Sequence, residues 1–164
     1  MPSIRTPYLL CLAVLMGCAT EKSASEKPAP AANAPVIKNL ALTASDEVPV
    51  CPAAAQGAQG TANVVLSPDE SSITTTVTYS GLSGPATAAH VHAGKVGVAG
   101  PVVLPYGGDL TSPINKTFTA ADYVAAPGAP PDFPSFVQAL KSGGAYSNVH
   151  TAACKPGEIR GQIQ

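Results

Sequence analysis

The sequence predicts an all-β domain: an antiparallel β-sandwich of the immunoglobulin or superoxide-dismutase type, with one short helix in a late connection. Three observations support this prediction. Short segments rich in Val, Ile and Thr alternate apolar and polar residues, as half-buried strands do. The 15 Gly and 17 Pro residues provide turns between these segments. Short strands separated by turns at regular intervals are typical of a sandwich or barrel.

The alternating segments occur in both halves of the domain. In the first half, strands are expected at residues 36–44, 61–67, 73–82 and 87–93. The clearest pattern is that of 73–82, where Ile73, Val77 and Tyr79 fall on one face and threonines on the other. In the second half, strands are expected at residues 100–106, 115–120, 145–151 and 158–164.

One segment, residues 131–144, departs from the strand pattern. Phe136 and Leu140 are four residues apart and would lie on one side of a helix. Ser135 is a candidate N-cap, and Gly143 is a candidate stop. The segment is therefore predicted to be a short helix inside a long connection.

The first 17 residues are predicted to be a lipoprotein signal peptide. Arg5 precedes an apolar run at residues 8–16, which has the length of a signal segment and is too short to span a bilayer. The run ends in "LMGC", Leu15–Cys18, which resembles the bacterial lipobox. This resemblance implies that Cys18 is lipidated and becomes the new N-terminus; the alternative is ordinary secretion.

Residues 18–35 are predicted to be the lipidated cysteine and a flexible Ala/Pro/Ser tether, followed by the folded domain at 36–164. The tether has no periodic apolar pattern with which to build a core. Ala19 resembles the residue found after the lipidated cysteine in outer-membrane lipoproteins. We therefore expect an exported protein in the cell envelope, attached through its lipid to the outer membrane and facing the periplasm or the cell surface.

The four cysteines separate by location. Cys11 lies in the signal and Cys18 would carry lipid, which leaves Cys51 and Cys154 for the folded domain. In an oxidising compartment two cysteines allow one intramolecular pairing, so a disulfide between Cys51 and Cys154 is predicted. The competing interpretation, a two-cysteine metal or redox site, lacks a CxxC motif.

The composition excludes several classes of function. The net charge is −1, and Lys and Arg are not clustered, so no nucleic-acid partner is expected. The sequence contains no GxSxG, HExxH, P-loop or GxGxxG motif. No catalytic residue is assigned, and the protein is not expected to be an enzyme.

Four stretches together indicate a family. They are "SDEVPV" at 45–50, "AAHVHAG" followed by "GPVV" at 88–103, "YSNVHT" at 146–151 and "PGEIRGQI" at 156–163. In order and spacing they resemble the CHRD domain, first described in chordin, over residues 40–163. This resemblance implies an all-β sandwich and an exported location. In chordin the domains belong to an extracellular antagonist that binds growth factors, and for bacterial members the resemblance implies no general activity.

All three histidines fall on related positions of predicted strands. His90 and His92 share one face of their strand, and Asn148 and His150 share one face of another. On the last strand, Glu158 and Arg160 lie opposite the apolar positions. If these strands adjoin in one sheet, all of these side chains gather on one polar surface facing away from the core.

Three interpretations of this surface remain open. The histidines, with Glu158 as a carboxylate neighbour, could bind one copper or zinc ion. They could instead hold the sheet face by hydrogen bonds, or contact a ligand or protein partner. The "HVH" stretch resembles copper–zinc superoxide dismutase locally, but three histidines are too few for its two-metal centre, which argues against dismutation. The leading prediction is a non-enzymatic binding module of the envelope; the alternative is a mononuclear copper or zinc protein that uses His90, His92 and His150.

Overall fold

The computed structural model describes Ser3 and residues 34–164. The predicted lipidation site Cys18, and all of the predicted signal and tether except Ser3 and residues 34–35, lie outside the described residues. None of the helices in the described part is long and apolar enough to cross a membrane.

Within residues 34–164, eight strands form one antiparallel sheet, which confirms the predicted all-β class. The strands are β1 (Val36–Thr43), β2 (Gln59–Leu66), β3 (Ser72–Ser80), β4 (Ala86–Ala93), β5 (Val102–Pro105), β6 (Ile114–Thr119), β7 (Ala145–Thr151) and β8 (Ile159–Ile163). Two 3₁₀ turns, η1 (Ala44–Asp46) and η2 (Ala120–Asp122), and one helix, α1 (Phe133–Lys141), complete the domain. Each predicted strand is present, because the alternation of β-branched and polar residues fits a half-buried pleated surface.

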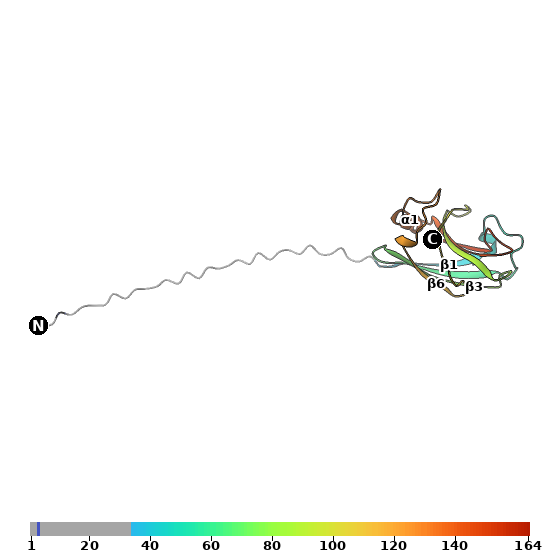
Figure 1. Cartoon of the computed structure of the whole chain (residues 1–164), viewed down its shortest axis with the longest axis horizontal. Coiled ribbons are helices and arrows are strands. Elements are labelled where there is room, and N and C mark those ends of the chain that lie inside the picture. The colour runs from blue at the N-terminus through green and yellow to red at the C-terminus, as the bar shows by residue number, and fades with distance from the viewer. Residues whose placement is uncertain (1–2, 4–33) are drawn as a thin grey trace. The chain divides into compact units, whose positions relative to one another are not determined.

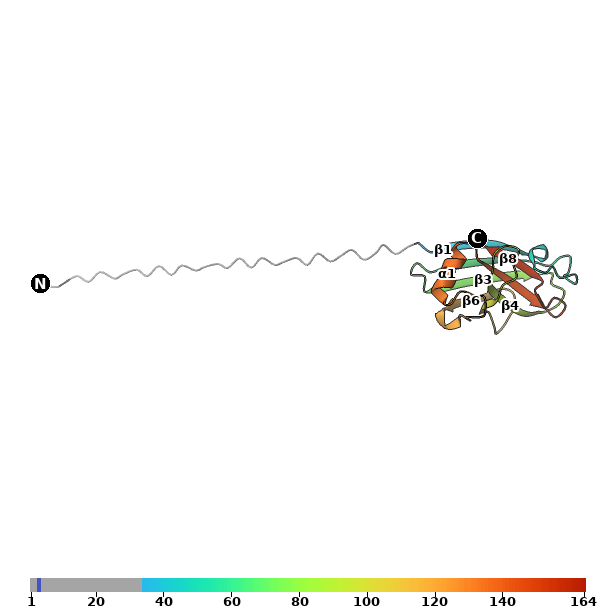
Figure 2. The ribbon, with the colours of Figure 1, turned by 90° about the horizontal axis from the view of Figure 1, so that it is seen from above.

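The sandwich is made by one sheet that folds back on itself. Its strand order is β5-β4-β7-β8-β1-β2-β3-β6, and the pairing of β8 with β1 is confined to Arg160 opposite Thr43. This narrow connection lets the half with β5, β4, β7 and β8 lie over the half with β1, β2, β3 and β6 (Figures 1 and 2). The arrangement is close to a barrel, with an apolar interior between the two halves.

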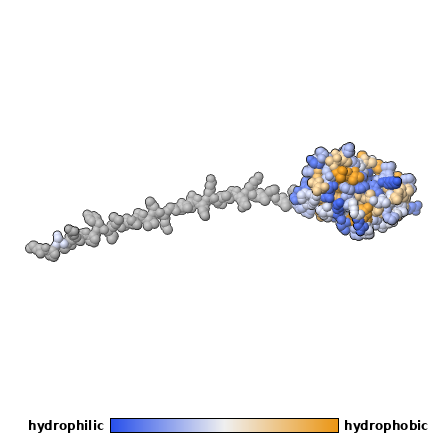
Figure 3. All heavy atoms as spheres, in the orientation of Figure 1, coloured by the Kyte–Doolittle hydropathy of each residue, from blue (hydrophilic) through white to orange (hydrophobic). Residues whose placement is uncertain are grey.

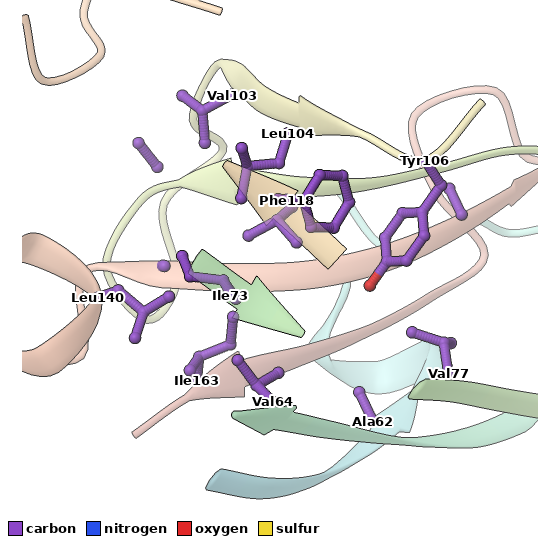
Figure 4. Close-up of a cluster of buried hydrophobic side chains, with 14 of the residues drawn as sticks. Ala62, Val64, Ile73, Val77, Val103, Leu104, Tyr106, Phe118, Leu140 and Ile163 are labelled. Atoms are coloured by element: carbon purple, nitrogen blue, oxygen red, sulfur yellow. The ribbon is translucent and has the colours of Figure 1, made fainter. Parts of the chain in front are cut away.

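The core fills the space between the two halves. Figure 4 shows Val64, Ile73 and Val77 of one half facing Leu104 and Ile163 of the other, and all five side chains are buried. Burying each of these side chains stabilises the fold by about 1.5–3 kcal/mol. The same strands turn their alternate, polar residues away from this interior.

Helix α1 packs against one end of the core. Its apolar side buries Phe133, Phe136, Val137 and Leu140, and Figure 4 shows Leu140 near Ile73 and Ile163. The predicted N-cap Ser135 is wrong: the helix begins after Asp132, whose Oδ1 accepts the Ser135 N–H at 2.8 Å. The reason is that Pro134 has no N–H and fits the first turn, which places the capping residue before it.

The two outer faces of the sheet differ. On β2, β3 and β6 the outward positions, such as Thr61, Thr74 and Thr117, are exposed, and Figure 3 shows hydrophilic and apolar residues interspersed over the face that it displays. Strand β7 is different, since all seven of its residues are buried. A strand can be buried on both faces only if other segments cover its outer face. Here the loops at residues 94–101 and 152–157 cover that face of β7.

Candidate metal site

Strand β7 lies between β4 and β8, and its register brings the predicted polar residues together. Across β4 and β7, His90 lies opposite Asn148 and His92 lies opposite Tyr146. Across β7 and β8, Asn148 lies opposite Arg160. Because directly opposite residues point to the same side of a sheet, these side chains share its outer face.

Of the predicted residues, His90, His92, Asn148, His150 and Arg160 share the face turned away from the core, but this face is largely buried. His92 is 6% exposed, His150 7%, Asn148 0% and Arg160 2%, and only His90 keeps intermediate exposure. Loops cover the face, with residues 94–101 and 152–157 supplying backbone carbonyls to these side chains. Strand periodicity specifies the face of a side chain but not the loops that cover that face, so the sequence pattern could not reveal the burial.

The structure brings the three imidazoles together. Nδ1 of His90 lies 2.9 Å from Nε2 of His150. One ring nitrogen from each of His90, His92 and His150 lies within 4.8 Å of the other two. Ligand nitrogens around a tetrahedral ion are about 3.4 Å apart when each bond is about 2.0–2.1 Å. Small side-chain movements would therefore bring this cluster to metal-binding geometry.

Two of the histidines are fixed by backbone carbonyls. Nδ1 of His92 lies 2.9 Å from the carbonyl oxygen of Gly100, and Nδ1 of His150 lies 2.8 Å from that of Lys155. Since a carbonyl can only accept, each Nδ1 carries the proton, and in the neutral ring each Nε2 presents a lone pair. Histidines that bind metals are held in this way, by donating the other ring N–H to a carbonyl or carboxylate.

The centre of the cluster has more acceptors than donors. Nε2 of His92 is buried and has no hydrogen-bond partner among the described residues. Oδ1 of Asn148 lies 3.0 Å from Nε2 of His150, while Nδ2 of Asn148 faces the Pro156 carbonyl at 3.4 Å. This orientation aims an oxygen lone pair at the same region as the two Nε2 lone pairs, and buried acceptors without donors are costly. A cation bound between them would satisfy these acceptors.

Tyr146 is a residue of the site that sequence reasoning missed. Its ring stacks on the imidazole of His92 with centroids 4.6 Å apart and an interplanar angle of 8°. The guanidinium carbon of Arg160 lies 3.4 Å from the centroid of the same ring. Because Tyr146 alternates with Asn148 and His150 along β7, the period of two could have identified it.

Glu47 was also missed. It follows η1 and is 2% exposed, and burial raises its pKa, an effect that the Val48 N–H, Arg160 and Asn148 oppose. Its carboxylate packs against Gly157, where an added Cβ would lie 2.0 Å from Glu47 Oε2. Glu47 lies in the stretch "SDEVPV". An acidic residue in such a stretch is usually assigned to an exposed turn, so the sequence offered little reason to place it at the site.

Glu158, predicted to lie beside the histidines, is directed elsewhere. Its Oε1 accepts the backbone N–H groups of Ala55 at 3.1 Å and Ser83 at 2.7 Å. Its Oε2 accepts the hydroxyls of Ser83 and Thr151, each at 2.6 Å. The structure therefore gives Glu158 a role in joining loops and does not bring it into the imidazole cluster. Glu158 precedes β8, so the alternation of that strand does not extend to it.

Burial keeps the histidines neutral. Burial and the neighbouring His150 and His92 lower the pKa of His90 to about 4. Burial likewise lowers the pKa of His92 and of His150, and the carbonyls that accept their Nδ1–H oppose this shift. At neutral pH all three rings therefore carry the lone pairs that a metal ion requires.

The predicted disulfide between Cys51 and Cys154 is confirmed, with Cα atoms 5.7 Å apart and a sequence separation of 103. Cys154 is fully buried. A disulfide of this kind indicates an oxidising environment.

The comparisons with known proteins agree with the fold and the motifs. The family model for the CHRD domain matches residues 28–163, which is most of the chain. No curated protein and no solved structure matches. The chain therefore belongs to the CHRD domain family.

Proposed function

We propose that this CHRD domain is a non-enzymatic binding module of the cell envelope that holds one transition-metal ion, copper or zinc, with His90, His92 and His150 as ligands. Imidazole nitrogen suits both metals, and three such ligands form an accepted arrangement for each. In this proposal the ion is carried or stored.

One observation carries the proposal: the buried convergence of acceptors. His92 Nε2 is buried and without a partner, and His150 Nε2 is oriented by the Lys155 carbonyl toward the same region. A purely structural cluster would place donors opposite these lone pairs. Here the ring nitrogen of His90 lies 2.9 Å from His150 Nε2, whereas His92 Nε2 has no partner among the described residues and is free to bind a cation.

The location of the module is part of the proposal. The lipobox-like Leu15–Cys18 supports export and lipidation at Cys18, and the Ala/Pro/Ser composition of residues 19–35 supports a tether. The Cys51–Cys154 disulfide supports an oxidising compartment outside the cytoplasm. The module would then present its metal site to other molecules of the envelope while the lipid holds it to the membrane.

Calorimetric titration of the oxidised protein with Zn²⁺ and with Cu²⁺ tests the metal site. We expect one ion per chain, bound with micromolar or tighter affinity. The variant His92→Phe removes a ligand nitrogen while keeping a ring to stack on Tyr146, and we expect it to abolish tight binding without loss of the fold.

Matched controls separate a metal site from a structural cluster. Asn115→Ala alters an exposed amide on the opposite half of the sheet, bonded to Thr76, and should bind like the original protein. If the unaltered, oxidised protein binds neither ion, or if His92→Phe only lowers the thermal midpoint, the histidines have a structural role and the proposal is wrong.

A further inference from the structure

The amide of Asn148 lies beside the imidazole cluster. Its Oδ1 lies 3.0 Å from His150 Nε2, and Asn148 lies directly opposite His90 in the register of β4 and β7. This oxygen therefore contacts one candidate ligand, His150, and its residue lies on the same sheet face as His90.

We infer that Oδ1 of Asn148 is the fourth ligand of the ion, so that the site is a closed set of three nitrogens and one oxygen. This inference rests on the proposed function, because it concerns the same ion. Amide oxygens are established ligands of cations in proteins and serve as weak ligands in copper sites.

The orientation of the amide supports this role. Asn148 Nδ2 faces the Pro156 carbonyl, which keeps the oxygen side directed at the cluster. The side chain is fully buried on the central strand β7, so its position is set by packing and little entropy is lost when it binds an ion.

No nearby carboxylate competes for the fourth position. Both oxygens of Glu158 already accept hydrogen bonds from Ala55, Ser83 and Thr151. Glu47 packs against Gly157, beside the Nδ2 group of Asn148, and does not join the group of close ligand atoms. The amide oxygen of Asn148, which lies 3.0 Å from His150 Nε2, is therefore our candidate for the fourth ligand.

A closed coordination sphere has a functional consequence. Metal sites that activate water keep one position open, whereas sites that hold an ion are filled by protein ligands. With Asn148 in place the ion would have no exchangeable water, which favours a role in holding or transferring the metal over hydrolysis.

Visible spectra of the Co²⁺-loaded protein test the inference, because bound anions change the spectrum only when a position is open. We expect azide to leave the spectrum of the unaltered protein unchanged. In Asn148→Ala, we expect the affinity to fall at least about tenfold and the spectrum to change with azide. Asn148→Asp restores an oxygen and should again be insensitive to azide, whereas Asn115→Ala should match the unaltered protein in every measurement.

The outcomes distinguish the two proposals. If the unaltered protein binds no Co²⁺, Zn²⁺ or Cu²⁺, the proposed function fails. If it binds Co²⁺ but its spectrum responds to azide, the metal site stands and Asn148 is not a ligand. Should Asn148→Ala fail to fold, the azide response of the unaltered protein and of Asn148→Asp decides the question.

Discussion

The carbonyl oxygen of Lys155 accepts a hydrogen bond from Nδ1 of His150 at 2.8 Å, and the preceding residue, Cys154, is bonded to Cys51. The disulfide thus anchors the segment that orients a candidate metal ligand. Pro156, in the same segment, faces Nδ2 of Asn148. We therefore expect oxidation of the two cysteines to favour assembly of the site.

The first prediction concerns this coupling. In the double variant Cys51→Ala, Cys154→Ala, residues 152–157 lose their covalent anchor, so His150 and Asn148 lose their fixed orientation. We expect the affinity for Zn²⁺, measured by calorimetry, to fall by about 10–100-fold, the range found when the outer partners of metal ligands are removed.

The same variant loses stability, and this needs a control. Opening a loop of 103 residues costs up to about 4–5 kcal/mol in the chain-entropy model, which urea unfolding measures. Phe118→Ala costs a comparable amount, about 3–5 kcal/mol, by removing a core ring distant from the histidines. If Phe118→Ala weakens Zn²⁺ binding equally under folded conditions, the effect is one of stability and the coupling is absent.

The fold could be predicted from the sequence because several of the strands show a clear period of two. Alternation in 73–82 or 145–151 is a local property, and turn residues mark where each segment ends. The disulfide also followed, since only Cys51 and Cys154 remained for one pairing. These features depend on residue type and order, which the sequence contains in full.

The site could be predicted only in part. The shared face of His90, His92 and His150 followed from strand geometry, and the structure brings these residues together. The burial of this face by loops could not be predicted from the sequence. The carbonyls of Gly100 and Lys155 reach the rings from loops, and the paths of loops leave no periodic signal in the sequence. Glu158 was misplaced for the same reason: its partners Ala55 and Ser83 lie in loops distant in sequence.

The second prediction is a pH dependence of the metal-free protein. Burial lowers the pKa of His90 to about 4, whereas an unfolded histidine has a pKa of about 6.5. Between these values the unfolded chain binds more protons, so the free energy of unfolding is largest above about pH 6.5 and falls as the pH drops toward 4. Urea unfolding in EDTA at a series of pH values measures this slope.

A variant identifies the source of the slope. His90→Gln removes one titrating ring while keeping a side chain that can donate to His150, and its stability should fall less steeply below pH 6.5. A slope identical to that of the unaltered protein would show that His90 does not contribute and that other groups carry the dependence.

The third prediction concerns Gly157, which lies at φ +142°. An added Cβ would lie 2.0 Å from Glu47 Oε2 and 2.8 Å from Asn148 Nδ2. Gly157→Ala should therefore destabilise the protein by about 2–4 kcal/mol through backbone strain and displaced side chains. Gly84→Ala meets no atom within 4 Å and should change the stability by less than about 0.5 kcal/mol; equal losses in both variants would contradict this account.

The fourth prediction concerns Glu158, which joins three segments by four hydrogen bonds. Burial raises the pKa of Glu158, but the hydrogen bonds from Ser83, Thr151 and Ala55 outweigh this effect and lower the pKa below its ordinary value. The ionised carboxylate therefore stabilises the fold fully above the unfolded pKa, and this stabilisation is lost as the pH falls through the folded pKa. Glu158→Gln removes the charge and should lower the free energy of unfolding by about 1–3 kcal/mol at pH 7, with a smaller difference at pH 3; urea unfolding at both pH values measures this.

The surface variant Glu70→Gln is the control. It loses an exposed contact with Lys141 and should lower the free energy of unfolding by less than about 1 kcal/mol. Since Glu158 does not contact the histidines, Zn²⁺ affinity should remain unchanged in Glu158→Gln, and a large loss of affinity would place the carboxylate in the metal site after all.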